Sequence, residues 1–451
     1  MDKDNALPSK PQIYKTSFDM AWPAILESFL LAMTGFVDNI MVSSQGDAAI
    51  AAVGLTVQPK FIGLAIFVSM SVAVSSIVAR RKGEQDKHSA NRVLKISLLI
   101  VVIGSVIISS IYLFFGENLM YLAGANADTI GISTQYLKIV MGGMIFNTVT
   151  IIINASQRGS GNTRISMVTN LTSNIVNVLF NFLLINGNFG FPALGVKGAA
   201  IATVIGSAVA CGMSIRSVFK KGSFMYIRQF KGIIPNKKDV KSMISIGLSA
   251  FCEQFFLRVG FFLFALTVAS LGTIQTTTHM ITMNFMHISF SFADGLAVAS
   301  VALVGRSLGE KRPDLAKIYG SACQKIGILC SIVVSLFFVI FGKQMFSLFT
   351  DTPEVLEQGM VLLYILCVVL VLQIQQVAII GCLRGAGDTK YTALISLVSV
   401  AIIRPFASWL LCYPLGLGLF GVWMGLFIDQ TLRFLMGFIR YRQGKWLNIK
   451  I

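Results

Sequence analysis

Four polar residues lie within long apolar runs of the first half of the chain, where they could bind a cation. Asp38 occurs in the first of these runs, Asn177 and Asn181 in a later one, and Thr203 in the run after that. A spacing of four residues places Asn177 and Asn181 on one face of a helix. A carboxylate, two amides and a hydroxyl offer oxygen ligands, which a hard cation such as Na⁺ prefers. A buried carboxyl also takes up a proton more readily than an exposed one, so Asp38 is equally a candidate proton carrier.

The alternative interpretation of these four residues is that they hydrogen-bond one another and hold neighbouring helices together. A possible second polar site contains Glu253 in the second half of the chain. Glu253 repeats Glu27 at a constant spacing, which indicates a shared architectural role, and Arg258 is near enough in sequence to pair with it. Ionisable residues within an apolar run are costly and are functional candidates for that reason.

Lys60, Arg404 and Arg433 are further basic residues within apolar runs. Lys60 could face Asp38 or Glu27 at a similar depth, whereas Arg404 is expected, like the i, i+4 pair Asp429 and Arg433, to form ion pairs between helices.

The elements that position these residues are membrane-spanning helices. The chain has 451 residues, 55% hydrophobic and 13% charged, where a soluble domain carries about a quarter charged residues. A transmembrane helix needs roughly 20 mostly apolar residues, and none of the runs alternates as a barrel strand would. The sequence therefore predicts an all-α polytopic membrane protein with about twelve transmembrane helices. We expect these helices near 17–43, 50–79, 93–115, 132–156, 165–187, 196–216, 243–271, 276–305, 318–342, 358–383, 391–414 and 421–440.

The excess of 37 Lys and Arg over 20 Asp and Glu is distributed as in a membrane protein. Positive charge concentrates in every second connection, which predicts that these connections and both termini are cytoplasmic. We expect a multi-pass protein of the plasma (inner) membrane in contact with lipid, and no nucleic-acid partner. The basic stretches are 80–95, 158–164, 216–241, 306–317, 384–390 and 440–450.

The two halves of the chain are copies of each other at a spacing of 226 residues. Glu27 is repeated by Glu253, and Arg158-Gly-Ser-Gly-Asn-Thr163 by Arg384-Gly-Ala-Gly-Asp-Thr389. Six spans per copy give both copies the same orientation, so the sequence predicts two six-helix bundles arranged as a parallel repeat. We predict an N-lobe at 1–215, a basic cytoplasmic linker at 216–242 and a C-lobe at 243–451. Such lobes can open a central cavity to each side of the membrane in turn.

The sequence contains no phosphate-binding loop and no H-E-x-x-H metal motif, so we expect neither an enzyme nor a cofactor. Uphill transport would then use an ion gradient.

The chain resembles the multidrug and toxic compound extrusion (MATE) family over essentially its whole length. The resemblance is carried by Pro23-Ala-Ile-Leu-Glu27, Gly35-Phe-Val-Asp-Asn-Ile-Met-Val42, the paired R-G-[SA]-G-[ND]-T turns, Leu194-Gly-Val-Lys-Gly-Ala-Ala-Ile-Ala-Thr203 and Leu303-Val-Gly-Arg-Ser-Leu-Gly309. It implies a cation-coupled antiporter that exports amphipathic, often cationic compounds in exchange for Na⁺ or H⁺. We expect a small-molecule substrate and a monomer.

The resemblance also implies roles for individual residues. Asp38 matches the family's first-helix carboxylate, and Asn177, Asn181 and Thr203 match its N-lobe cation site, which makes these four residues a possible Na⁺ site. Glu253 matches the seventh-helix glutamate of the NorM-type subgroup. The departure from the pattern is Gln373, which aligns with the acid that partners this glutamate in that subgroup. The resemblance therefore favours the N-lobe site over one at Glu253 and Gln373.

Two other classes of function compete with the antiporter. A flippase for lipid-linked oligosaccharides or related lipids would need a more cationic cavity, for which Lys60, Arg258 and Arg404 are the candidates. A non-transporting scaffold or a channel is the third class. The sequence does not choose between Na⁺ and H⁺.

Overall fold

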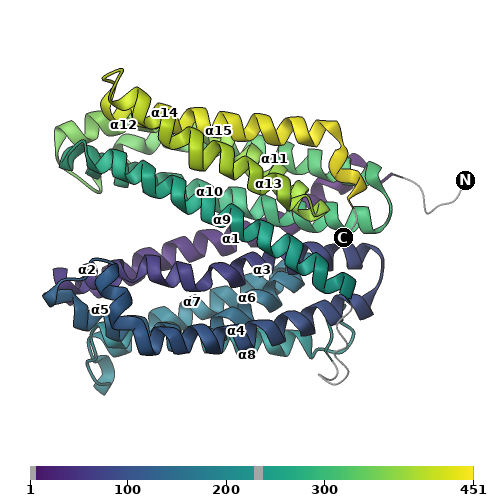
Figure 1. Ribbon diagram of the computed structural model, residues 1–451, viewed down its shortest axis with the longest axis horizontal. Coiled ribbons are helices and arrows are strands. Elements are labelled where there is room, and N and C mark those ends of the chain that lie inside the picture. The colour runs from purple at the N-terminus through teal and green to yellow at the C-terminus, as the bar shows by residue number, and fades with distance from the viewer. Residues whose placement is uncertain (1–6, 228–236, 450–451) are drawn as a thin grey trace, which may run out of the picture. The chain divides into compact units, whose positions relative to one another are not determined.

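The computed structural model describes residues 7–227 and 237–449, and every regular element in these ranges is a helix (Figure 1). The helices before residue 228 are α1 (Lys10–Ser43), α2 (Asp47–Leu55), α3 (Val57–Gly83), α4 (Lys87–Leu122), α5 (Ala127–Gly142), α6 (Met144–Gly159), α7 (Thr163–Ile185), the short η2 (Asn188–Gly190) and α8 (Val196–Val218). Those after residue 236 are α9 (Lys237–Ala269), α10 (Thr273–Gly309), α11 (Pro313–Ser347), α12 (Pro353–Ala386), α13 (Thr389–Ile395), η3 (Ser396–Ile403), α14 (Arg404–Cys412), α15 (Gly418–Gln443) and η4 (Lys445–Asn448).

The helices confirm the predicted class of all-α polytopic membrane protein. Within the described ranges, 11 helices are long and apolar enough to cross a membrane, or up to 12 when the bent pair α5 and α6 counts as one span. Each predicted apolar run falls on one of these spans. The helices are longer than the runs because they continue into polar ends. α3, for example, ends in Arg80, Arg81 and Lys82.

Three spans are interrupted where the sequence weakens the regular helix. α2 and α3 meet at Thr56, and α5 and α6 meet at Gly143 with a bend of 47°. The third interruption is η3, a π-helix that precedes Pro405. Proline has no backbone N–H and its ring clashes with the carbonyl four residues earlier, so it disfavours a regular α-helix in the preceding turn.

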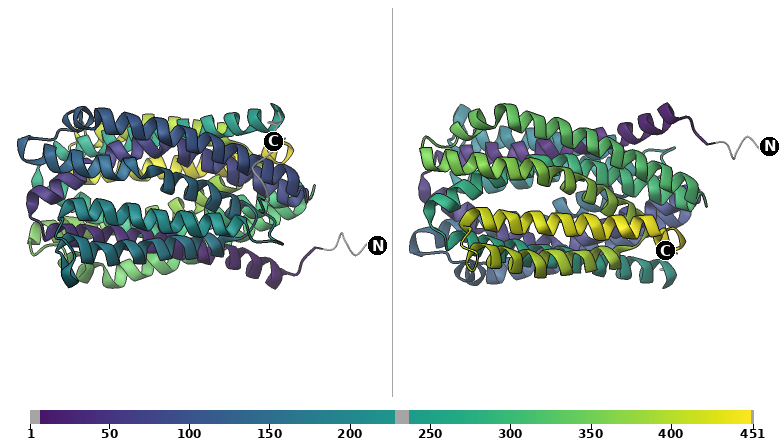
Figure 2. Two further views of the ribbon diagram at one scale, coloured as in Figure 1. Left: turned by 90° about the horizontal axis from the view of Figure 1, so that it is seen from below. Right: turned by 90° about the horizontal axis from the view of Figure 1, so that it is seen from above.

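The chain divides into two compact units. The N unit is Leu26–Gly247, and the C unit is Met1–Ile25 together with Leu248–Ile451. Both boundaries fall within helices, α1 and α9. In the N unit α3 packs on α6 and α7 on α8, and in the C unit α12 packs on α10 and α11 while α14 packs on α15. The views in Figure 2 show the long helices of each unit running beside one another. The division into lobes at 1–215 and 243–451 stays a prediction.

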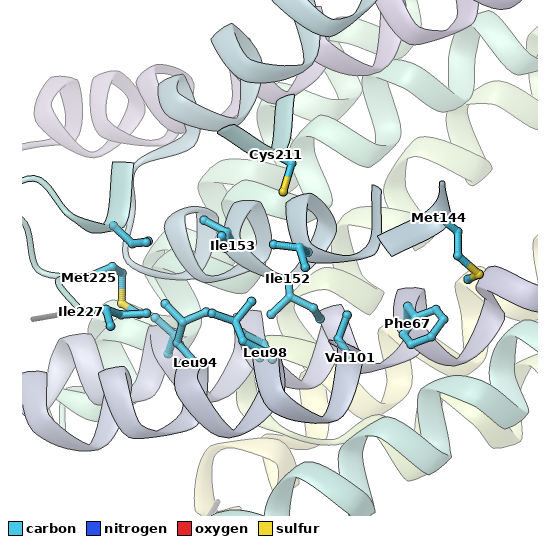
Figure 3. Close-up of a cluster of buried hydrophobic side chains, with 14 of the residues drawn as sticks. Phe67, Leu94, Leu98, Val101, Met144, Ile152, Ile153, Cys211, Met225 and Ile227 are labelled. Carbon is cyan, nitrogen blue, oxygen red and sulfur yellow. The ribbon is translucent and has the colours of Figure 1, made fainter. Parts of the chain in front are cut away.

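The core of the N unit is apolar and includes the first part of the predicted linker 216–242. Figure 3 shows Phe67 of α3, Leu94 and Leu98 of α4 and side chains of α6 gathered in one cluster. Met225 and Ile227, which follow α8, are completely buried in this cluster. The rest of the linker includes residues 228–236, which lie outside the described residues.

The repeated R-G-[SA]-G turn has the same construction in both units. A side chain at its first glycine would collide with a neighbouring helix. A Cβ on Gly159 would lie 2.4 Å from the carbonyl oxygen of Ser75, and one on Gly385 would lie 2.6 Å from that of Val301. The second glycine of each turn has a φ of +90° or +86°, in the left-handed region that favours glycine at a helix end. The turn thus ends one helix at a fixed place and starts the next.

Candidate functional site

Asp38, Asn177, Asn181 and Thr203 come together in the N unit, from α1, α7 and α8. The Nδ2 of Asn181 donates to Asp38 Oδ1 at 2.7 Å and to Asn177 Oδ1 at 3.3 Å. The Nδ2 of Asn177 donates to Thr203 Oγ1 at 3.3 Å. The structure therefore brings the four predicted residues into one connected cluster, as the spacing on α7 indicates. Their role as a cation site stays a prediction.

The cluster presents one buried oxygen atom that lacks a hydrogen-bond donor. Asn181 is 1% exposed, and among the described residues its Oδ1 accepts no hydrogen bond. Asn177 can turn either end of its amide toward Asp38, because the two ends are nearly the same shape. Its nitrogen would donate to Asp38 Oδ1 at 2.8 Å, whereas its oxygen would face that carboxylate as a second acceptor. Neighbouring acceptors of this kind suit a bound cation.

Two further side chains adjoin the cluster. Tyr136 of α5 is buried and hydrogen-bonds with the Thr203 side chain. Lys60, in the first turn of α3, places its ammonium 5.0 Å from the centre of the Tyr136 ring and interacts electrostatically with Asp38. The sequence left Asp38 and Glu27 open as partners of Lys60, and the structure favours Asp38. Tyr136 was missed because a tyrosine in an apolar run has no distinguishing pattern.

A small cavity reaches this cluster. Its volume is about 40 Å³, and Lys60 and Thr203 are among the residues that line it, together with Asn147 and Ser207. This volume can hold water or a small ion, whereas sites for drug-sized ligands measure about 300–1,000 Å³. The cavity can therefore hydrate an ion next to Thr203.

Glu27 lies in a separate polar cluster of the N unit. Its Oε1 accepts hydrogen bonds from Arg158 Nη1 at 3.2 Å, from Ser166 Oγ at 3.0 Å and from Asn170 Nδ2 at 2.5 Å. Arg158 belongs to the R-G-S-G turn. Through these hydrogen bonds Glu27 links α1 to the end of α6 and the start of α7.

Glu253 makes the corresponding contacts in the C unit. It accepts from Arg384 Nη2 at 2.7 Å and from Thr392 Oγ1 at 2.8 Å. These partners repeat Arg158 and Ser166 at the spacing of 226 residues that relates Glu253 to Glu27. The repeated arrangement supports an architectural role for both glutamates. The spacing could have predicted both pairs, because it repeats the arginines as well as the glutamates.

Gln373 does not join Glu253 in a hydrogen-bonded site. It is fully buried in α12, and neither its amide nitrogen Nε2 nor its amide oxygen Oε1 has a hydrogen-bond partner among the described residues. Within the C unit, the structure therefore does not connect Glu253 and Gln373 of the possible second polar site in the way it connects the cluster at Asp38, and Glu27 belongs to the N unit.

The predicted ion pairs of Arg404, Asp429 and Arg433 are present in the C unit. Arg404 Nε and Nη2 donate to Asp429 Oδ2 at 2.9 and 2.5 Å, and Arg433 Nε lies 3.4 Å from Asp429 Oδ1. All three residues are at most 5% exposed. A buried charge in a membrane protein is expected to be paired in this way.

Comparison with known proteins agrees with this architecture. The model of the MatE family matches residues 23–183 and 250–410, once in each half of the chain. The "Probable multidrug resistance protein NorM" of Thermotoga maritima is 25% identical over 447 residues, which cover 98% of this chain and 95% of that protein. The "Multidrug resistance protein MdtK" of Yersinia pestis is 25% identical over 448 residues, covering 95% of this chain and 94% of that protein.

A solved structure described as the outward-facing conformation of a multidrug resistance MATE family transporter of the MOP superfamily has the same fold. Its TM-score is 0.89 at 22% identity, with 98% of this chain and 100% of that chain covered. The family model matches well over half of the chain, in two copies that coincide with the internal repeat. The chain belongs to the MatE family of membrane transporters.

Proposed function

We propose that this protein is an antiporter of the plasma membrane that exports amphipathic, cationic compounds in exchange for Na⁺ or H⁺ bound at Asp38. The observation that carries the proposal is the arrangement at Asn181. One end of its amide donates to Asp38, while the other end is a buried oxygen without a donor. A buried acceptor without a donor costs free energy, and the amide that carries this one contacts a carboxylate that can bind a cation. A cation bound by Asp38 and this oxygen would satisfy both.

Lys60 and the bound cation would alternate as counterions of Asp38. Without a bound cation, the Lys60 ammonium stabilises the Asp38 carboxylate electrostatically. A Na⁺ ion or a proton at Asp38 removes that attraction, and the contact of the Lys60 ammonium with the face of Tyr136 remains to stabilise its charge. The net charge of Asp38, Lys60 and the bound cation together therefore rises by one each time a cation binds and falls by one each time it is released.

Coupling follows if the cation and the compound prefer different facing states. Only a difference in affinity between two states can shift their equilibrium. In the proposed cycle, cation binding from outside favours the state that has released its compound, and cation release inside favours the state that binds the next one. The excess of basic residues in alternate connections supports placing both termini in the cytoplasm, so that export runs away from that side.

The nature of the compound is inferred from the relatives. The two multidrug resistance proteins named above match this chain over 95% and 94% of their own length. A flippase for lipid-linked oligosaccharides is less well supported. Arg404, one of the basic residues that favoured it, is completely buried against Asp429 and offers no open charge to a pyrophosphate.

The test is ethidium efflux from proteoliposomes under an imposed Na⁺ gradient or an imposed pH gradient. We expect one gradient to drive efflux by the wild-type protein and Asp38→Asn to reduce the driven rate at least tenfold. Asp351→Asn, which neutralises an exposed carboxylate in the loop before α12, is the matched control and should retain the wild-type rate. Full gradient-driven efflux by Asp38→Asn would refute the proposal. No efflux under either gradient would refute the coupling and direct attention to other substrates.

A further inference from the structure

The C unit holds a charged cluster at the place where the internal repeat predicts a counterpart of the Asp38 site. The guanidinium of Arg404 bonds Asp429 through two nitrogens, and both residues are 0% exposed. The Cζ of Arg404 also lies 4.4 Å from the centre of the Phe261 ring and 5.8 Å from that of Phe264. Arg404 is thus enclosed by one carboxylate and two aromatic rings.

The repeat relates this cluster to the N-unit site residue by residue. The spacing of 226 places Thr203 on Asp429 and Asp38 on Phe264. It places Asn177 on Ile403, one residue before Arg404. The π-helix Ser396–Ile403 has no counterpart in α7, and a π-turn accommodates one residue more than an α-turn. With that residue counted, Arg404 takes the place of Asn177.

The hydrogen bonds support this correspondence. In the N unit the Asn177 amide hydrogen-bonds with Thr203 whichever of its ends faces that residue, and in the C unit Arg404 donates to Asp429. Each unit therefore has one carboxylate in its cluster, contributed by α1 in the N unit and by α15 in the C unit. The donor in the C unit carries a positive charge, whereas its counterpart in the N unit is a neutral amide.

We propose that the Arg404 guanidinium is a permanent, tethered cation that fills the C-unit counterpart of the exchangeable cation site. The guanidinium remains charged at every physiological pH, so it neither leaves nor titrates. Arg433, the second arginine at Asp429, gives this cluster a net positive charge, which repels a mobile cation. It follows that the coupling cation binds only in the N unit and that one transport cycle uses one cation site.

This inference rests on the proposed function, and two experiments separate the two. The first is gradient-driven ethidium efflux by a triple variant, Arg404→Met with Asp429→Leu and Arg433→Met, because Arg433 is also buried against Asp429. Replacing every partner of a buried charge cluster by apolar residues of similar size preserves folding in many proteins. We expect this variant to retain at least half of the wild-type coupled efflux. A folded triple variant whose efflux falls at least tenfold would overturn the inference.

The second experiment counts ²²Na⁺ bound to purified protein in nanodiscs. We expect one Asp38-dependent ion in the wild type and none in Asp38→Asn. Converting the C-unit cluster to its N-unit counterpart, with Arg404→Asn and Arg433→Ser, should add one ion that Asp429→Asn removes. An ion that remains in Asp38→Asn and is lost on further substitution of Asp429 would overturn the inference, even if the converted variant does not fold.

Failure of the proposed function and failure of the inference about Arg404 give different experimental results. Retained coupling in Asp38→Asn refutes the proposed function, whatever happens at Asp429. If coupling is by protons and no Na⁺ binds, the efflux of the triple variant under a pH gradient decides whether Asp429 takes part in the cycle. Should that variant not fold, Arg404→Gln with Asp429→Asn and Arg433→Gln gives the same comparison with neutral polar side chains in place of the charged ones.

Discussion

Removing the arginine of the R-G-A-G turn should destabilise the C unit through its buried partner. Arg384→Met leaves the carboxylate of Glu253, which is 2% exposed, with only Thr392 as a hydrogen-bond donor among its described contacts. Removing one partner of a buried ion pair costs about 3–5 kcal/mol. For a unit of about 200 residues, each kcal/mol lowers the melting temperature by about 2–4 °C, so we expect a decrease of roughly 6–20 °C.

The assay is thermal unfolding of the detergent-purified protein, followed by size-exclusion chromatography. The double variant Arg384→Met with Glu253→Gln should recover much of the loss, because it no longer leaves a buried charge without its partner. Arg306→Met is the control, since Arg306 pairs with Glu310 at the protein surface, where such a pair contributes about 0–1 kcal/mol. If the double variant is as unstable as the sum of the two single variants, the pair is not coupled and the architectural role of Glu253 is wrong.

Two further changes test the site and the fold. Lys60→Gln removes a positive charge that interacts with Asp38, worth between about 1 kcal/mol in water and about 4 kcal/mol near a protein at 4 Å, and should raise the affinity for the coupling cation at least about fivefold. The half-saturating cation concentration for efflux measures this, and an unchanged or weaker affinity would contradict the role of Lys60. Gly385→Ala places a methyl group 2.6 Å from the carbonyl oxygen of Val301 and should cost about 1–3 kcal/mol, whereas Gly212→Ala, with nothing within 4 Å, should be neutral. Equal melting temperatures for these two alanine variants would show that the turn tolerates a side chain.

The sequence alone predicted the membrane-spanning helices, because an apolar run of this length that does not alternate can cross a membrane only as a helix. Its limits appear where helices are interrupted. The bend at Gly143 and the π-helix before Pro405 arise within runs that are apolar throughout, so hydropathy does not mark them. The interruption at η3 bears on the inference about Arg404, because the extra residue of a π-turn aligns Arg404 with Asn177.

The cluster at Asp38 was predictable in part. The spacing of Asn177 and Asn181 specified a shared helix face, and the oxygen-rich set specified the chemistry. The contribution of Tyr136 was not predictable, because contacts between distant helices depend on packing that no local pattern encodes. The pairs at Glu27 and Glu253 could have been found from the repeat, since their arginines recur at the same spacing.

The most direct test of the central claim measures the coupling cation itself rather than the exported compound. An outward or inward ethidium gradient is imposed across proteoliposomes without any cation gradient, and the movement of ²²Na⁺ or of protons is recorded. Because coupling between two ligands is reciprocal, the wild-type protein should move the cation opposite to ethidium, and Asp38→Asn should move none. Ethidium movement without cation movement in the wild type, or equal cation movement in Asp38→Asn, would contradict the account.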